Sequence, residues 1–251
     1  MIDSLSTILT GITLNYLSLF FLTTFTSIIA GVFGLGGGLI LAVTLPWFVP
    51  VNAVVPIHGT TQLASNVSRL MMSYQHVVWS LVPQFVIGSL AGVALFSLVL
   101  TNLSSQYIPV IIAIYLLLSL WVKSVDRLLS KIESFYLVGM LQTGLGLVVG
   151  APGPLTVTLL MKKLSHREQI IATASLLMVL VNFAKVATYA TLGFVFWDYL
   201  SPIIFAILGA FFGSYIGTKL RGKVDPLRFL HLLKWLLTLL ALQILIRFSF
   251  F

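Results

Sequence analysis

The sequence lacks cysteine and has few charged residues. None of the 251 residues is a cysteine, which excludes disulfide bonds and thiolate metal sites. Only 8% of the residues are charged, whereas a soluble domain carries about a quarter. These charges are too few to cover a water-facing surface of this size. A phosphate-binding loop, a cluster of metal ligands and paired membrane aspartates are also missing, so we expect no enzyme activity, no cofactor and no metal site.

Long apolar stretches make up most of the chain. Hydrophobic residues account for 59% of the sequence, and the mean hydropathy is +1.10. About 20 apolar residues span a bilayer as a helix, and runs such as Leu116-Leu117-Leu118 lack the alternation of a membrane barrel. The sequence therefore predicts an all-α, polytopic transmembrane bundle. Its ten apolar segments are 14–31, 36–49, 54–73, 80–100, 106–122, 132–149, 153–162, 168–193, 201–218 and 229–249.

Two of these segments, 36–49 and 153–162, are short for a full crossing. The first residues, Met1 to Leu14, contain no Lys or Arg, unlike the positive start of a secretory signal. We therefore interpret them as the outer end of the first helix.

Basic residues are concentrated in three loops, which explains the net charge of +8 without nucleic acid as a partner. The positive-inside rule places such loops in the cytoplasm. Counting crossings from them predicts a bacterial inner-membrane protein with both termini outside, although Arg247 near the C-terminus does not fit this rule. The three loops contain Lys123, Arg127 and Lys131; Lys162, Lys163 and Arg167; and Lys219, Arg221, Lys223 and Arg228.

Similar landmarks recur in the same order in residues 1–125 and 126–251. Each half has five segments, and an odd number forces the second half to enter the membrane from the opposite side. The sequence therefore predicts two transmembrane inverted repeats, a plan common among secondary transporters. The paired landmarks are Gly34–Gly38 with Gly150–Pro154, Asn66–Arg69 with Asn182–Lys185, Tyr74–Trp79 with Tyr189–Trp197, and Gly88/Gly92 with Gly209/Gly213.

The glycine-rich stretches Gly34–Gly38 and Gly150–Pro154 break helices. One interpretation is a tight turn that joins two full-length helices. The other is a re-entrant hairpin whose second arm begins near the membrane centre and points free N–H groups at an anion. The second interpretation makes a set of glycines candidate substrate ligands: Gly36, Gly37, Gly38, Gly150 and Gly153.

Arg69 and Lys185 are the cations that fall inside apolar segments at matched places, each three residues after an asparagine. Because residues i and i+3 share a helix face, Asn66 and Asn182 can sit beside them. Charges inside a bilayer usually mark function, so these four residues are candidate substrate ligands. The alternative is that both cations snorkel to a membrane face.

Polar residues upstream of Arg69 suggest a polar path along the same helix. Thr61 and Ser65 are further candidate ligands, and Gly209, Gly213 and Gly217 predict close helix packing within the monomer. His58 is more readily a structural hydrogen-bonding residue than a proton carrier.

Acidic residues are missing from the middle of every apolar segment. The six in the chain fall in loops or at segment ends: Asp3, Asp126, Glu133, Glu168, Asp198 and Asp225. The sequence therefore predicts neither a carboxylate proton relay nor a carboxylate-bound sodium site.

At these residues the chain resembles the TauE/SafE family of sulfite-exporter-like membrane proteins. The resemblance covers nearly the whole chain, although its second copy reads Gly150-Ala151-Pro152-Gly153-Pro154 and departs from the glycine pattern. It implies export or uptake of sulfite, organosulfonates or related small anions. Its features are Gly31–Gly38, Gly59–Arg69, Tyr74–Trp79, the second copy from Gly144 to Phe194, and Gly209–Leu220.

Together these features predict a secondary transporter for a small anion, sulfite or an organosulfonate, that works by alternating access. Export is the favoured direction, because the inside-negative potential expels an anion. The alternatives are an anion or small-solute channel and, with less support, an intramembrane enzyme or helper protein. The expected partners are the small-molecule anion and the lipid bilayer. The sequence leaves the oligomeric state open, a homo-oligomer included.

Overall fold

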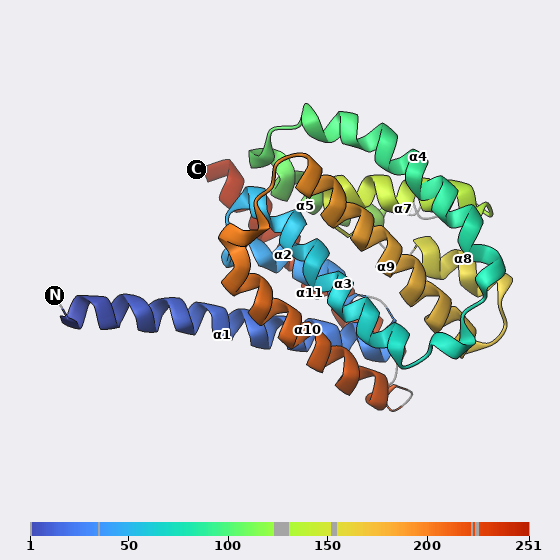
Figure 1. Cartoon of the computed structure of the whole chain (residues 1–251), viewed down its shortest axis with the longest axis horizontal. Helices are drawn as coiled ribbons and strands as arrows, with labels where there is room; N and C mark the ends of the chain where they lie inside the picture. Colours follow the sequence, from blue (N-terminus) through green and yellow to red (C-terminus); the bar gives the residue numbers. More distant parts are fainter. Residues whose placement is uncertain are drawn as a thin grey trace.

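The computed structural model describes the backbone of residues 2–34, 36–122, 131–151, 155–221, 223 and 226–250. This part of the chain contains helices and no strand, which confirms the all-α prediction (Figure 1). The α-helices are α1 (Ile2–Phe33), α2 (Gly37–Thr44), α3 (Val54–Met71), α4 (Val82–Thr101), α5 (Ile108–Trp121), α7 (Phe135–Val149), α8 (Leu155–Lys163), α9 (Arg167–Thr191), α10 (Leu200–Leu220) and α11 (Pro226–Phe250). Short 3-10 turns lie between them: η1 (Leu45–Trp47), η2 (Val51–Ala53), η3 (Tyr74–His76), η4 (Trp79–Leu81), η5 (Ser105–Tyr107) and η6 (Phe196–Tyr199).

Each predicted apolar segment coincides with a helix to within a few residues, except at the start of the chain. α1 begins at Ile2, so the first residues extend the first helix, as expected. The predicted boundary between the two halves, near residue 125, lies outside the described residues.

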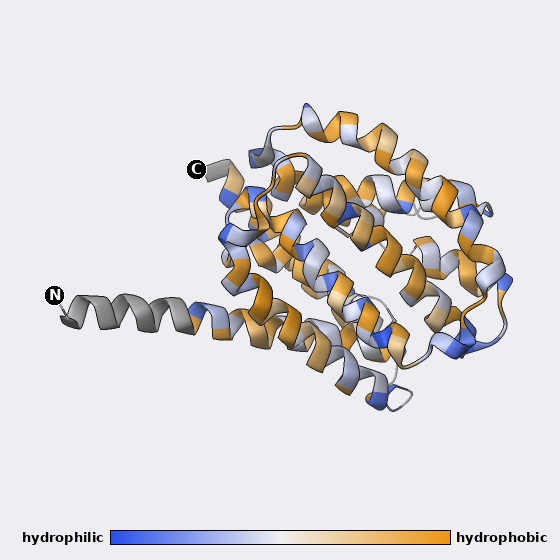
Figure 2. Cartoon of the chain, viewed as in Figure 1, coloured by the Kyte–Doolittle hydropathy of each residue, from blue (hydrophilic) through white to orange (hydrophobic). Residues whose placement is uncertain are grey.

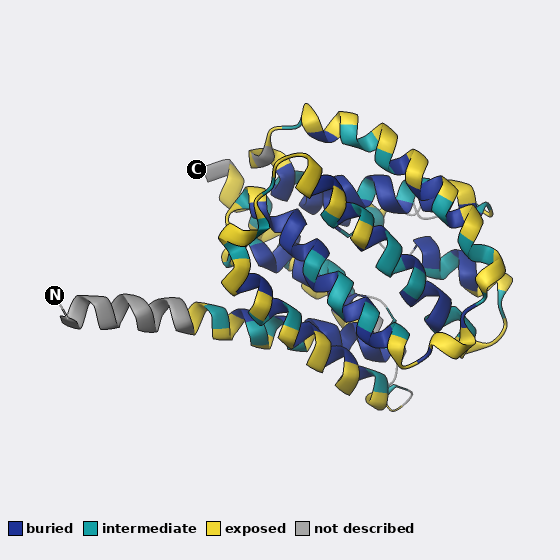
Figure 3. Ribbon diagram, viewed as in Figure 1, coloured by how far each residue is buried: buried dark blue, intermediate teal, exposed yellow. Residues whose placement is uncertain are grey.

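Several of the described helices have the length and apolarity of membrane spans. Large hydrophobic residues such as Phe21, Leu98 and Leu239 are exposed. Hydrophobic residues occur along all the described helices (Figure 2), and buried residues concentrate in the middle of the bundle (Figure 3). An apolar exterior of this kind suits lipid as solvent. Five stretches qualify by length and composition: Leu14–Phe33, Trp79–Thr101, Arg167–Thr191, Phe196–Leu220 and His231–Phe248.

α2 and α8 are too short to cross a bilayer by themselves. With 8 and 9 residues they extend about 12 and 14 Å, against a hydrocarbon core of about 30 Å. The tight-turn interpretation, with full-length helices on both sides, therefore does not describe them. Gly34 and Gly36 connect α1 to α2 with φ of 79° and 91°, and Gly150 ends α7 with φ of 75°. L side chains rarely adopt this left-handed region, which explains glycine at these breaks.

Glycines allow two pairs of helices to pack at close range, α10 against α1 and α4 against α7 (Figure 1). A Cβ atom on Gly213 would lie 2.1 Å from the carbonyl oxygen of Thr24. A Cβ atom on Gly88 would lie 1.9 Å from the carbonyl oxygen of Tyr136. These contacts confirm the prediction that the glycine face packs within the monomer.

Ion pairs bring several helix ends together. Glu133, just before α7, lies 3.6 Å from Lys162 and 3.9 Å from Lys163 at the end of α8. Arg221, at the end of α10, lies 3.8 Å from Glu168 at the start of α9. Because Lys163 and Arg167 are separated by a short loop, these helix ends form one end of the bundle, which we call the basic end. Burial lowers the pKa of Arg221 there, and Glu168 opposes this shift.

Candidate functional site

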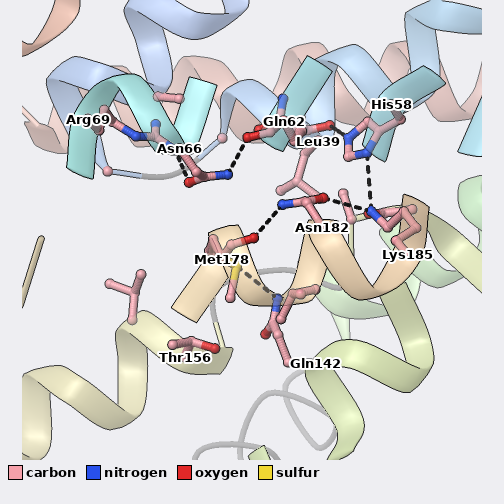
Figure 4. Close-up of a pocket in the computed structure, with 18 residues that line it drawn as sticks. Leu39, His58, Gln62, Asn66, Arg69, Gln142, Thr156, Met178, Asn182 and Lys185 are labelled. Carbon is pink, nitrogen blue, oxygen red and sulfur yellow. Dashed lines mark hydrogen bonds between the residues drawn. The ribbon is translucent and has the colours of Figure 1, made fainter. Parts of the chain in front are cut away.

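A cavity of about 120 Å³ lies where α3 and α9 pack against each other in the centre of the bundle (Figure 4). Both glycine breaks and the start of α8 reach it. None of its lining residues is acidic. They are Ala30, Gly34, Gly36, Gly38, Leu39, His58, Gln62, Asn66, Arg69, Gln142, Gly150, Ala151, Thr156, Val157, Met178, Val181, Asn182 and Lys185.

Most of the predicted site residues line this cavity. The structure brings together seven of them from three helices and two breaks: Asn66, Arg69, Asn182, Lys185, Gly36, Gly38 and Gly150. Gly153 lies outside the described residues.

Three predicted site residues do not line this cavity. Gly37 packs against α1, where an added Cβ would lie 1.9 Å from the carbonyl oxygen of Thr26. Thr61 donates to its own helix at the carbonyl oxygen of Ile57, at 2.8 Å. The hydroxyl of Ser65 lies 2.7 Å from that of Ser214 on α10. Each helix position turns by about a quarter of a circle, so Thr61 and Ser65 face α10 while the next residues face the cavity.

The predicted pairing of each asparagine with its cation is present in both halves. The amide of Asn66 donates to the carbonyl oxygen of Gln62 at 2.7 Å, and its Oδ1 accepts from Arg69. The amide of Asn182 donates to the carbonyl oxygen of Met178 at 2.8 Å, and its Oδ1 accepts from Lys185 at 3.1 Å. In each case one turn of helix orients the asparagine, which then holds the cation.

Lys185 is fully enclosed, with a relative exposure of 1%. Its Nζ lies 2.7 Å from the carbonyl oxygen of Gly150, 3.1 Å from Oδ1 of Asn182 and 3.5 Å from Nδ1 of His58. An ammonium group has three protons to donate, so these three acceptors occupy all of them. The stem passes Gly59, where an added Cβ would lie 3.0 Å from Cδ of Lys185.

Arg69 is also buried, with an exposure of 6%, yet its hydrogen bonding is incomplete. Its Nη1 has no partner among the described residues, and the same holds for Nε2 of Gln62, two turns earlier on α3. Neither cation reaches the surface of the bundle, which does not fit the snorkelling interpretation. A buried N–H group without an acceptor is costly, so these donors are suited to a ligand that accepts hydrogen bonds.

Four lining side chains were not among the predicted ligands: Gln62, Gln142, Thr156 and Met178. The amide of Gln142 donates to the sulfur of Met178 at 3.7 Å. Gln62 could have been found from the sequence, because residues 58, 62, 66 and 69 follow the i, i+4 and i, i+3 spacing of one helix face. Gln142 and Thr156 carry no such signal.

A second cavity of about 410 Å³ continues from the first toward the basic end. Arg69 and Asn66 belong to both cavities, whereas Lys185 and His58 line only the first. The second cavity extends as far as Ser165 and Arg167, in the loop before α9 and at its start. The central site is therefore reached from the basic end on the side of Arg69.

Comparison with protein-family models matches residues 19–244 to the family described as sulfite exporter TauE/SafE. The match covers most of the chain. The chain belongs to the TauE/SafE family. TauE/SafE proteins are membrane transporters of the sulfite and sulfonate exporter type, rather than enzymes. No curated protein and no solved structure matched the chain. The family assignment confirms the resemblance found in the sequence, and the cavity is the candidate site of this TauE/SafE member.

Proposed function

We propose that this protein is a secondary transporter for a small oxyanion, sulfite or an organosulfonate, which it binds in the cavity between α3 and α9. The observation that carries the proposal is the pair of unpartnered donors, Arg69 Nη1 and Gln62 Nε2, in a cavity lined by no acidic residue. Oxygens of a sulfite or sulfonate group only accept hydrogen bonds, and the planar guanidinium can bind two of them at once.

The first turn of α2 supports the same assignment. Gly36 caps this helix without a side-chain hydrogen bond, and Gly38 and Leu39 line the cavity. The positive end of the helix dipole and its free N–H groups favour an anion there. Because the cavity is small, the transported group is small as well.

We further propose that the chain works by alternating access between two inverted halves. The same sequence spacing separates Gly34 from Gly150 and Asn66 from Asn182, and each pair makes equivalent contacts. The packed helix pairs correspond too. α1 packs against α10, and their counterparts in the other half, α7 and α4, pack against each other. α1 ends at the basic end, where Nε of Arg221 donates to the carbonyl oxygen of Gly31 at 3.1 Å, and its counterpart α7 begins there, as an inverted arrangement requires.

The positive-inside rule supports a cytoplasmic location for the basic end, in the inner membrane of a bacterium. The second cavity then opens to the cytoplasm. For an anion that moves alone, a potential of 100 mV, negative inside, favours export by about 2.3 kcal/mol per charge. This corresponds to a concentration ratio of about fifty, so export is the expected direction of uncoupled transport.

The test has a binding stage and a flux stage. Purified protein is screened by thermal shift against sulfite, methanesulfonate, sulfate and acetate, and the stabilising anions are then followed as radiolabelled flux in liposomes. We expect stabilisation by sulfite or methanesulfonate and a flux that saturates. A flux that rises linearly with concentration would indicate the channel alternative, and no binding of any oxyanion would refute the proposal.

A further inference from the structure

His58 connects the two glycine breaks through Lys185. One ring nitrogen, Nε2, lies 2.9 Å from the carbonyl oxygen of Gly38, and the other, Nδ1, lies 3.5 Å from Nζ of Lys185 (Figure 4). A carbonyl oxygen only accepts and an ammonium group only donates, so Nε2 carries the proton and Nδ1 accepts. The contacts thus define a neutral imidazole whose unprotonated nitrogen faces a buried cation.

We propose that His58 takes up a proton when the anion binds, and that the proton is the ion transported together with it. This inference rests on the proposed function and names its coupling ion. The proton adds to Nδ1, and the hydrogen bond from Lys185 to that nitrogen breaks. The ammonium group of Lys185 then has a free N–H group directed into the cavity, as Arg69 already has.

The surroundings explain why the two events belong together. A second positive charge beside Lys185 is unfavourable in a buried site unless a negative charge arrives with it. No acidic residue lines the cavity, so the anion is the group that can supply that charge. Bound anion and added proton therefore stabilise each other, and by linkage each raises the affinity for the other.

Among the described residues, helices packed against α3 place no titratable side chain other than Lys185 on His58. Lys185 of α9 contacts it, whereas α2 and α7 contribute the backbone oxygens of Gly38 and Gly150. The remaining titratable groups have other positions. Arg69 bonds Asn66 farther along α3, Tyr189 of α9 donates to the carbonyl oxygen of Leu147, Lys219 of α10 lies over the ring of Tyr215, and Tyr16 of α1 stacks on Phe205.

Proton coupling changes the driving force. A monovalent sulfonate that moves with one proton carries no net charge, so its flux follows the pH gradient and its own gradient. A divalent anion with one proton keeps one negative charge, and the membrane potential still favours its export. His58 thereby sets the direction that a given substrate takes.

The experiment compares driven and undriven flux of radiolabelled methanesulfonate, which stays monovalent near neutral pH, in liposomes with the potential clamped at zero. A pH step of one unit, alkaline inside, is expected to give about tenfold accumulation by the wild-type protein above protein-free liposomes, because one unit corresponds to a factor of ten per proton. His58→Gln retains a donor for Gly38 and His58→Asn retains an acceptor for Lys185, but neither takes up a proton. Both variants are expected to lose the pH-driven accumulation. They are expected to exchange labelled for unlabelled methanesulfonate at equal pH only at higher anion concentrations than the wild type, because a bound proton no longer raises the anion affinity.

His166→Gln is the matched control, since His166 precedes α9 outside both cavities, and it is expected to match the wild type. Retained pH-driven accumulation in both His58 variants would overturn the inference. Complete loss of exchange at saturating anion in both variants would also overturn it, because His58 would then act in binding or folding. If the wild type exchanges the anion but the pH step has no effect, proton coupling is refuted and the proposed function is not. If the wild type exchanges neither methanesulfonate nor sulfite, the proposed function itself is refuted.

Discussion

Arg69 and Lys185 occupy matched positions on α3 and α9, yet only Lys185 has an acceptor for every proton of its charged group. Nη1 of Arg69 has no partner among the described residues. Arg69 also lines the cavity that opens at the basic end, and Lys185 does not. The two cations therefore have different tasks in this conformation. Arg69 is free to bind an entering anion, while Lys185 holds the closed part of the site together through Gly150 and His58.

Arg69→Ala is expected to weaken anion binding strongly while the protein still inserts and folds. Hydrogen bonds to charged groups contribute about 1.5–3 kcal/mol, so affinity should fall by roughly ten- to a hundredfold or more. Arg69→Lys should keep part of the attraction and lose the forked geometry. Thermal shift with sulfite measures the loss, and Lys219→Ala, an exposed cation of α10, is the control. Unchanged affinity in Arg69→Ala would assign the anion to another group.

Lys185→Met is expected to fold with a lower unfolding temperature than the wild type and to lose transport by at least about tenfold. The substitution keeps a long side chain beside Gly59 and removes the cost of a buried charge, but it leaves the acceptors of Gly150, Asn182 and His58 without a donor. The hydrogen bonds to Gly150 and His58 disappear. Melting in detergent and sulfite flux in liposomes separate the two effects. Full transport by this variant would show that Lys185 serves only to fill space.

Gly88→Leu is expected to destabilise the bundle strongly. A Cβ at Gly88 would lie 1.9 Å from the carbonyl oxygen of Tyr136, so α4 and α7 must separate. Overpacking of this kind typically costs about 1–3 kcal/mol and occasionally more. Ala91→Leu, one turn away on the exposed face of α4, is the matched control and should leave the unfolding temperature unchanged. Equal unfolding temperatures for the two variants would contradict the close approach of α4 to α7.

Single cysteines at Ser104 and Lys223 test the topology, because the wild-type chain has no cysteine to interfere. Both positions are exposed. An impermeant thiol reagent added to intact cells should label Ser104→Cys and leave Lys223→Cys unlabelled until the membrane is opened. The reverse pattern would place the basic end outside and remove the basis for the proposed direction of export.

The sequence predicted the parts of the site that depend on local spacing. Asn66 with Arg69 and Asn182 with Lys185 were found because an i, i+3 pair shares a helix face, and the glycine breaks were found because glycine at membrane depth interrupts a helix. Thr61 and Ser65 were wrongly expected to face the cavity. Both side chains are polar, but contacts with Ser214 and the glycines of α10 set the rotation of α3 about its axis. Only the fold brings α10 next to α3.

The network around Lys185 could not be predicted in the same way. Its acceptors are separated in the sequence, with His58 on α3 and Gly150 at the end of α7. Gln142 enters the cavity from α7 without a motif that distinguishes it from other buried polar residues. Long-range packing decides such contacts, and neither hydropathy nor helix periodicity reports it.

A site that holds two buried cations without a carboxylate has a kinetic consequence. In the proposed alternating-access cycle, the positive charge stays uncompensated in the central cavity when the anion leaves, and the protein changes its accessible side in that state. Reorientation of the empty carrier is then the slow step, because buried charge without a counterion is unfavourable in a membrane. In the loaded carrier the anion lies beside Arg69 and Lys185 and compensates part of their charge. Exchange of one anion for another across the membrane will therefore be faster than net transport. An anion on the opposite side of the membrane will stimulate transport of the first.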